Sequence, residues 1–277
     1  MDKISNDEII SALNRSGYLL ENRILKLFIK NSFYAESSHA LFFNPEENKY
    51  REIDILATKQ LHTMFLEDKF NSVAINIHFV VECINNPQPL GLFENLGDMD
   101  EPSSDWIYEI TNGTPELREN ISLKIHSLID FVERTRIKAP PSRQYCGFSK
   151  KKDTNNKEPW MATHSDDFHK TLLKLVEATK HKKEEINRLW DGRRPQICRL
   201  DFIIPTVVLQ GNIISVFQRD ELKIKDELFQ RLKTPYEEIY NRNMSVDIVQ
   251  ENYFEQYLIT KQEWITDIIN CIIEILR

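Results

Sequence analysis

Apolar side chains recur at helical spacing near the start of the chain. Within residues 16–30 one face carries Leu20, Ile24, Leu27 and Phe28. Ser16-Gly17 separates this segment from a shorter one, residues 7–14, because glycine ends a helix more readily than it continues one. The pattern predicts two consecutive helices.

Short apolar runs rich in β-branched and aromatic residues follow. Residues 40–43 and 51–57 flank a polar, turn-like stretch and predict a hairpin. Residues 73–84 form a longer run of this kind. Asn85-Asn86-Pro87 ends the run, since proline restricts its own backbone and that of the residue before it. Residues 73–84 therefore predict a strand in the interior of a sheet.

Helical spacing returns twice in the middle of the chain. Thr114-Pro115 suits a helix start, because threonine caps a helix and proline fits its first turn. Ser165, followed by two aspartates, predicts the start of another helix, which should pack against the sheet. Residues 139–159 between them read as a loop with one short strand.

The last third of the chain predicts further strands and a closing helix. Residues 201–209 and 213–217 flank Gly211-Asn212, a pair suited to a two-residue turn, and predict a second hairpin. Residues 245–249 predict a last strand, and residues 264–275 carry the apolar face of a helix. Helices and strands are mixed without strict alternation or an internal repeat, so the expected class is α/β or α+β.

Composition describes a globular, water-soluble chain. It has 277 residues, 41% of them hydrophobic, and a formal net charge of −7. The acidic start does not resemble a signal peptide, and no apolar run reaches the length of about 20 residues that spans a bilayer. The four cysteines lie far apart, without a CxxC pair, so neither a zinc site nor a disulfide framework is indicated. We expect a cytoplasmic protein with no membrane partner.

The middle of the chain is basic. Residues 138–199 contain 15 Lys and Arg against 8 Asp and Glu, whereas the chain as a whole is acidic. Lys150, Lys151 and Lys152 could contact a phosphate backbone, and so could a second group along one predicted helix and its end. That second group is Lys180, Lys182, Lys183, Arg188, Arg193 and Arg194. The alternative is that both groups only form a solvated surface.

Two carboxylates interrupt strands that are otherwise apolar. Asp54 lies within residues 53–57, and Glu82 ends the run at residues 77–81. Burying an unpaired carboxylate is costly, so such a group usually binds a metal or a base, or lies at a strand end. Carboxylate oxygens suit a divalent cation such as Mg²⁺, and Glu21 on the second helix could supply a third. Alternatively, Glu82 points into solvent and Asp54 pairs with Arg51 or Lys59.

Together these segments resemble the PD-(D/E)xK nucleases of the restriction-endonuclease-like fold. Residues 16–23, 51–57 and 80–89 carry the resemblance, and residues 204–211 are similar to a later strand of the family. The resemblance implies an αβββαβ core with a mixed central sheet flanked by helices, plus helical and hairpin additions. It implies a single domain over residues 1–277, in which 1–95 form the first half of the core, 96–164 a helical and loop insertion, and 165–277 the second half with the C-terminal helix.

The resemblance also implies the chemistry of the site. Glu21, Asp54 and Glu82 are the expected catalytic residues, and Asp54 and Glu82 the expected ligands of Mg²⁺ or Mn²⁺. DNA is the expected partner, with metal-dependent hydrolysis of its phosphodiesters as the activity and prokaryotic defence as the setting. No nucleotide cofactor is expected, because the sequence contains neither GxxxxGK[ST] nor GxGxxG.

Two positions depart from the family pattern. Ile84 stands where the family has lysine, two residues after the acid, and Ile53 stands where a proline often precedes the aspartate. Residues i and i+2 of a strand share a face, so Ile84 removes an ammonium from the site. Neither Lys26 nor Lys59 is an obvious replacement. Two functions follow: an active DNA endonuclease, or a catalytically lapsed nuclease-fold protein that binds nucleic acid, a partner protein or a second copy. An unrelated α/β interaction protein is a third.

Overall fold

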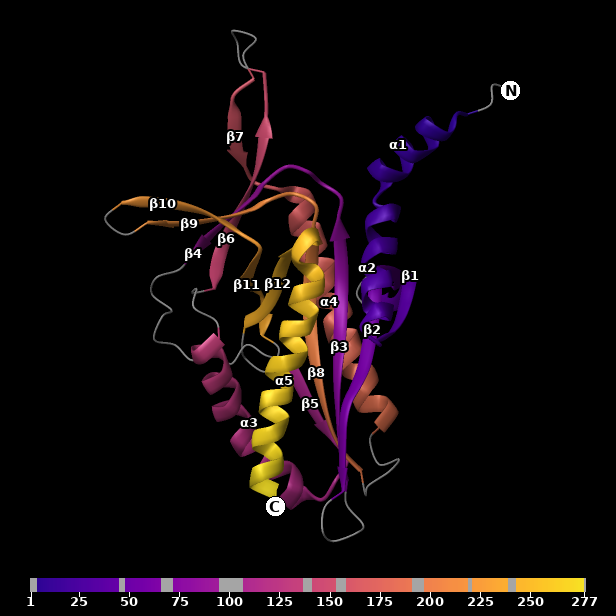
Figure 1. Cartoon of the computed structure of the whole chain (residues 1–277), viewed down its shortest axis with the longest axis vertical. Coiled ribbons are helices and arrows are strands. Elements are labelled where there is room, and N and C mark those ends of the chain that lie inside the picture. Colours follow the sequence, from indigo (N-terminus) through magenta and orange to yellow (C-terminus); the bar gives the residue numbers. More distant parts are fainter. Residues whose placement is uncertain are drawn as a thin grey trace.

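The structure is a computed structural model, and it describes residues 4–44, 48–65, 72–94, 107–136, 141–152, 158–190, 197–218, 221–238 and 243–276. Helices and one large mixed sheet make up this part of the chain (Figure 1). None of the helices described is both long enough and apolar enough to cross a membrane.

The sheet contains twelve strands within the described residues. These are β1 (Tyr34–Asn44), β2 (Lys49–Phe65), β3 (Ser72–Ile84), β4 (Leu90–Glu94), β5 (Ile107–Thr111), β6 (Ser142–Lys150), β7 (Trp160–Thr163), β8 (Ile197–Leu209), β9 (Ile213–Gln218), β10 (Leu222–Glu227), β11 (Phe229–Glu238) and β12 (Asn243–Gln250). Their order is β1-β2-β3-β8-β12-β11-β6-β4-β9-β10, with β5 also paired to β8 and β7 to β6. The first three strands are antiparallel to one another, whereas β3, β8 and β12 run parallel.

Helices cover both faces of the sheet. They are α1 (Asn6–Ser16), α2 (Tyr18–Lys30), α3 (Pro115–Arg136), α4 (Asp166–Trp190) and α5 (Phe254–Leu276), with a 3-10 turn η2 (Glu251–Tyr253) before α5. One hydrophobic core joins α2, α3 and α5 to the sheet, and a second core joins α4 to the opposite face. Figure 1 shows α5 in front of the sheet and α4 behind it. The mixed α/β class with a sheet flanked by helices agrees with the expectation.

Several local sequence signals that concern one element or one turn are confirmed. Gly17, with a φ of 88°, separates α1 from α2, and Ser5 caps α1 through a reciprocal capping box with Glu8. The first hairpin is β1 and β2, with Asn44 opposite Lys49. β3 is an interior strand between β2 and β8. These elements depend on short-range periodicity and caps, which a sequence displays directly.

The predicted second hairpin is wrong. β8 lies between β3 and β12, whereas β9 pairs with β4 and β10, so the strands on the two sides of Gly211-Asn212 separate. A strand as fully buried as β8, with all but two of its positions buried, covers more surface in the middle of the sheet than it would at the edge of a hairpin.

The stretch read as mostly loop, residues 139–159, contains the nine-residue strand β6. Most residues of β6 are exposed or half-buried, and besides its neighbour β7 the strand pairs with β4 and β11, which are distant in sequence. The segment 96–164 therefore contributes β5, β6 and β7 to the sheet as well as α3.

Candidate functional site

Asp54 and Glu82 lie beside each other on the face of the sheet that α4 covers. β2 and β3 are antiparallel with Ile55 opposite Val81, so the next residues of each strand are also neighbours. Side chains alternate across a strand, so Glu82 shares its face with Val80, which belongs to the core beneath α4. The predicted pair of strand carboxylates is therefore brought together.

Lys174 of α4 completes this group. Its Nζ lies 2.6 Å from Oε2 of Glu82 and 3.7 Å from Oδ1 of Asp54. The other oxygen of Asp54 accepts a hydrogen bond of 2.7 Å from the Cys83 backbone N–H. One ammonium thus contacts both carboxylates, and we call Asp54, Glu82 and Lys174 the acid-lysine site.

Glu82 is the member of the acid-lysine site that is buried without a hydrogen-bond partner on each oxygen. It is only 4% exposed, and its Oε1 has no hydrogen-bond partner. Burial, and after it the charge of Asp54, raises the pKa of Glu82 to about 8, although Lys174 acts in the opposite direction. A buried carboxylate with an unsatisfied oxygen is costly, and such groups concentrate at functional sites.

Two alternatives for these acids are now decided. Glu82 does not point into solvent, because it is buried. Arg51 forms an ion pair with Glu177 at 3.3 Å, and Lys59 donates to the Asn31 carbonyl and to Gln262, so the ammonium between the two carboxylates belongs to Lys174.

Lys174 was missed by the sequence reasoning, which found no replacement for the family lysine. Lys174 lies in α4 within Leu172-Leu173-Lys174-Leu175-Val176, and a charge in so apolar a run is the only local signal. Ile84 is half-buried against the core beneath α4, so it shares the face of Glu82 without supplying a charge.

Glu21 does not complete a set of three ligands. It lies on α2, and its carboxylate is close to Gly17, which packs against Asn85 at the end of β3. The pKa of the Cys83 thiol is raised by burial first, and then by the charges of Asp54, Glu82 and Glu21. Across the described residues, no group of three His, Cys, Asp or Glu side chains could hold a metal ion. The expected role of Glu21 as a third acid is therefore not supported by an assembled ligand group.

The two strand carboxylates still fit a magnesium site in their chemistry. Mg²⁺ prefers oxygen ligands and is usually held by one or two carboxylates while it keeps several waters. Glu82 offers a buried oxygen without a partner, and Asp54 lies on the adjacent strand. Lys174 already places a positive charge between them.

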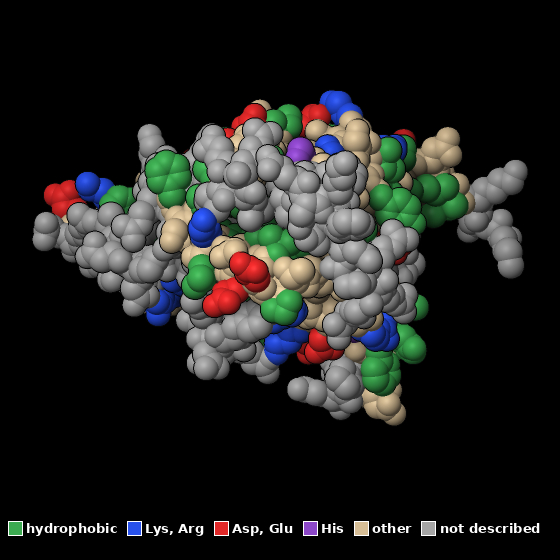
Figure 2. All heavy atoms as spheres, turned by 90° about the horizontal axis from the view of Figure 1, so that it is seen from below, with side chains coloured by type: hydrophobic (Ala, Val, Ile, Leu, Met, Phe, Trp, Pro, Cys, Tyr) green, Lys and Arg blue, Asp and Glu red, His purple; other side chains and the backbone are tan. Residues whose placement is uncertain are grey.

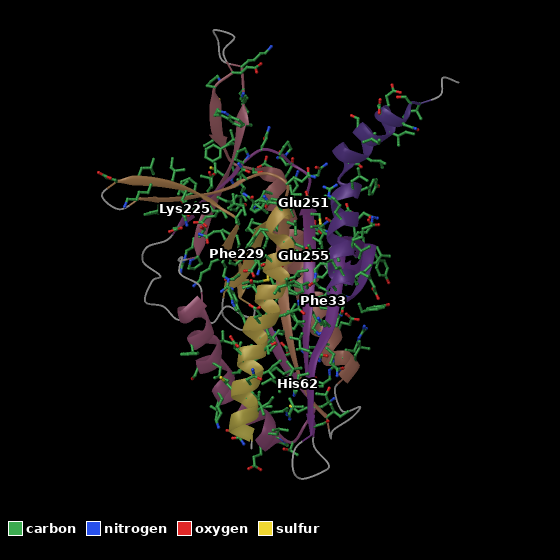
Figure 3. The ribbon with its side chains drawn as sticks, in the orientation of Figure 1. Phe33, His62, Lys225, Phe229, Glu251 and Glu255 are labelled. Carbon is green, nitrogen blue, oxygen red and sulfur yellow. The ribbon has the colours of Figure 1, made fainter. Side chains whose placement is uncertain are left out.

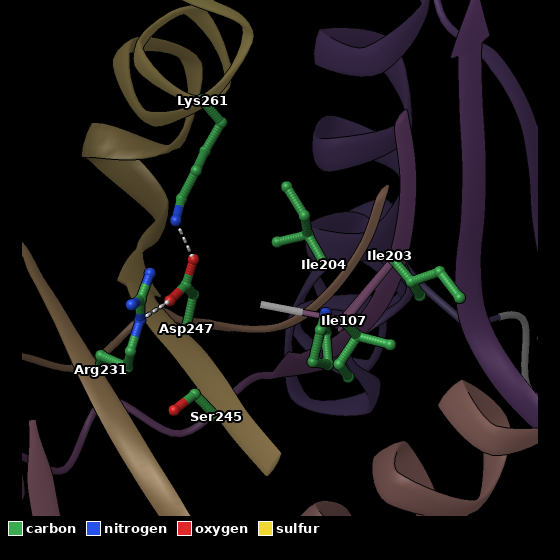
Figure 4. Close-up of a pocket in the computed structure, with 8 residues that line it drawn as sticks. Ile107, Ile203, Ile204, Arg231, Ser245, Asp247 and Lys261 are labelled. Carbon is green, nitrogen blue, oxygen red and sulfur yellow. Dashed lines mark hydrogen bonds and ion pairs between the residues drawn. The ribbon is translucent and has the colours of Figure 1, made fainter. Parts of the chain in front are cut away.

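A second buried carboxylate, Asp247 of β12, has a different environment (Figure 4). One of its oxygens accepts hydrogen bonds from Lys261 and Tyr257, and the other from Arg231. Burial alone would raise the pKa of Asp247, but Lys261 and Arg231 hold it below its usual range. The adjoining cavity of about 20 Å³ is the size of one water. Both oxygens of Asp247 accept hydrogen bonds, so we interpret this cluster as structural.

In the basic middle of the chain, residues 138–199, some cations are paired with acids and others are exposed. Several of its cations are held by acids: Lys174 by Glu82 of β3, Lys183 by Glu109 of β5, and Arg199 by Asp201 of the same strand, β8. Arg193 and Arg194 lie outside the described residues. Of the two predicted phosphate contacts, the group at residues 150–152 at the end of β6 remains exposed.

Charge of both signs is mixed elsewhere. In the view from the end of the molecule opposite β7, acidic and basic side chains are interspersed (Figure 2). Near the top of α5, Glu251 forms an ion pair with Arg23 of α2 (Figure 3). The carboxyl ends of β8 and β12 lead into an open cavity of about 540 Å³ beside this ion pair.

Comparisons of the chain with protein-family models, with curated proteins and with solved structures gave no match.

Proposed function

We propose that this protein is a metal-dependent nuclease of the PD-(D/E)xK type that hydrolyses DNA phosphodiesters at the acid-lysine site. The single observation that carries the proposal is the ammonium of Lys174 in contact with both Asp54 and Glu82. From α4 it supplies the positive charge that β3 lacks, because Ile84 stands where the family has lysine.

The order of elements supports the same proposal. A helix, three antiparallel strands, a second helix and a strand parallel to the third follow one another as α2, β1, β2, β3, α4 and β8. This is the order that the αβββαβ core of the resemblance implies. The described elements between β3 and α4, which are β4, β5, α3, β6 and β7, then belong to an insertion whose strands extend the sheet.

Each residue of the site has a definable task. Asp54 and Glu82 would hold the divalent cation, which when bound polarises the phosphate and lowers the pKa of a water. The Asp54 carboxylate is kept in place by the Cys83 N–H. Lys174 would offset the negative charge that builds up on the phosphate in the transition state.

The experiment compares metal binding with cleavage in matched variants. We expect the wild type to bind Mn²⁺ in calorimetry and to nick plasmid DNA in Mg²⁺ or Mn²⁺. Asp54→Asn and Glu82→Gln should lose metal binding and cleavage, whereas Lys174→Ala should keep metal binding but cleave ~10²- to 10⁴-fold more slowly. Lys170→Ala is the control, because Lys170 lies in the same helix but is exposed and forms its ion pair with Asp167.

A second-site variant tests the role assigned to Lys174. Ile84→Lys should add nothing to the wild type but should partly restore cleavage to Lys174→Ala, because position 84 shares the face of Glu82. Thermal melting must first show that each variant folds. A wild type that binds neither Mn²⁺ nor Mg²⁺ contradicts the proposal.

The second candidate function is a lapsed nuclease fold that binds nucleic acid or a protein. It is favoured by one observation: Lys174 already neutralises Glu82, so the site has a counter-ion of its own. Metal binding without cleavage by the wild type, unchanged in Lys174→Ala, would favour a lapsed site over an active nuclease.

A further inference from the structure

The strands β6 and β7 extend beyond the rest of the sheet as an arm (Figure 1). β4 pairs with β6 from Ser142 to Gly147, and from Phe148 onward the partner of β6 is β7, with Lys150 opposite Trp160. We define the arm as residues 148–152 and 158–162, the part of it that the structure describes.

The arm exposes a large aromatic side chain. Trp160 is 56% exposed and its neighbour Met161 46% exposed. The ammonium of Lys150 lies 5.3 Å from the centre of the Trp160 ring, so the indole is held from one side by a cation–π contact. A tryptophan that is more than half exposed, with an ammonium against one side of its ring, is a flat apolar platform at the surface of the arm.

Positive charge surrounds this platform. Lys150, Lys151 and Lys152 are all exposed, and Glu158 is the one acid in the described part of the arm. The Lys151 N–H donates to the Pro159 carbonyl, which fixes the backbone next to the ring. An aromatic platform beside lysines combines stacking on a base with attraction to phosphates.

We propose that the arm binds single-stranded nucleic acid, with an unpaired base stacked on Trp160 and the lysines on the adjoining phosphates. Bases inside a duplex are already stacked on one another, so only an unpaired or frayed base can use the platform. A protein partner could also contact the apolar surface of Trp160 and Met161, but it would interact less favourably with the three neighbouring lysines than a phosphate backbone would.

The arm is joined to the acid-lysine site at its base. The Phe148 N–H donates to the Pro89 carbonyl, in the loop that follows β3, and the Tyr145 hydroxyl is hydrogen-bonded to His169 of α4. Glu82 and Lys174 belong to this strand and this helix. The inference deepens the proposed function, on which its substrate class rests: the strand held by the arm would be the one that is cut.

The test measures binding without cleavage. Labelled 20-nucleotide oligo(dT) and a blunt duplex of the same length are titrated with the full protein in EDTA by fluorescence anisotropy. We expect tighter binding of oligo(dT). Trp160→Ala should weaken it by ~5- to 100-fold, which corresponds to the value of one stacked base, whereas Trp160→Phe should retain most of it. Tyr34→Ala, which removes an exposed aromatic residue on β1, is the matched control.

Salt provides a second measurement. The triple substitution of Lys150, Lys151 and Lys152 by alanine should reduce the slope of log affinity against log salt for the single strand by about 2, because each neutralised phosphate releases counterion. An unchanged slope would mean that these lysines only form a solvated surface, and would overturn their part in the inference.

The outcomes separate this inference from the proposed function. Binding of oligo(dT) that depends on Trp160 supports the arm even when no metal-dependent cleavage is found. Equal affinity for single strand and duplex, unchanged in Trp160→Ala, overturns the arm, as does a protein that binds neither. Cleavage that is lost in Asp54→Asn but unaffected in Trp160→Ala would leave the nuclease proposal standing without the arm.

Discussion

Glu82 and Asp247 are both buried carboxylates on strands, but their hydrogen-bond partners differ. Asp247 has donors on both oxygens, and its pKa lies below the usual range despite burial. Glu82 has Lys174 on one oxygen and no partner on the other, and its pKa is raised to about 8. Both groups are carboxylates with the same exposure of 4%, so the partners decide that one group stabilises the fold and the other is a candidate for chemistry.

Replacing Glu82 with glutamine should change how stability depends on pH. The pKa of Glu82 is about 8 in the folded protein against 4.5 ordinarily, so the folded state binds the proton more tightly between these values. The stability from protonated Glu82 is therefore fully present below pH 4.5 and is lost as pH rises through 8, at up to about 1.4 kcal/mol per pH unit. Without metal, the melting temperature of Glu82→Gln should fall less than that of the wild type between pH 5 and 8.5.

Glu263→Gln, on the exposed side of α5, should melt like the wild type at every pH and serves as the control. If the wild type and Glu82→Gln lose the same number of degrees over this range, Glu82 does not take up a proton on folding.

At the scale of elements, Gly211 shows why a turn signal was misread. Gly211-Asn212 suits a two-residue hairpin turn, but here it carries the chain from β8 to β9, which are not paired. The Gln210 N–H donates to the Ile84 carbonyl, so this turn packs on the end of β3. A Cβ at position 211 would collide with the carbonyl oxygens of Gln88 and Asn86. Glycine is needed for close backbone approach, not for a hairpin.

Gly211→Ala should therefore destabilise the protein. Backbone oxygens cannot move aside as a flexible side chain can, so we expect a loss of about 1–3 kcal/mol in the free energy of unfolding, as for other overpacked sites. Urea denaturation measures it, with an unchanged m-value. Gly147→Ala is the matched control, because its Cβ would approach Ser165 only to 3.3 Å. Equal stability of the two variants would argue against the packing described here.

At the scale of the whole molecule, the sheet changes from a covered centre to an open edge. β3 and β8 lie between strands on both sides and between cores on both faces. β10 pairs only with β9 among the described strands, and most of its residues are exposed, including Leu222 and Ile224. The acid-lysine site thus lies on the most firmly held part of the sheet, which suits a site that needs fixed geometry.

Hydrogen exchange should follow this arrangement. Amides of β3 and of the paired part of β8 should exchange slowest, near the rate set by global unfolding, whereas those of β10 should exchange orders of magnitude faster, because they open by local fraying. Mass spectrometry of deuterated peptides measures both. Protection of β10 equal to that of β3 would contradict an open edge and would indicate that a second copy or another chain covers it.

The elements that depend on short-range pattern could be predicted from the amino-acid sequence. Helical spacing, the Gly17 break, the first hairpin and the interior run of β3 are properties of residues close together in the chain. The same alternation predicted that Asp54 and Glu82 would interrupt buried strands, and the antiparallel pairing of β2 and β3 brings them together. Contacts between residues of one hairpin or meander can be predicted without reference to distant segments of the chain.

The partners that come from distant segments could be identified only from the folded chain. Lys174 reaches Glu82 because α4 crosses the face of the sheet on its way to β8, and nothing near Lys174 in sequence specifies that crossing. The pairing of β8 with β3 and β12, and of β9 with β4, follows from competition among all strands for buried positions. The local pattern indicates which side chains of a strand can be buried, but the neighbour of each strand depends on the arrangement of the whole sheet.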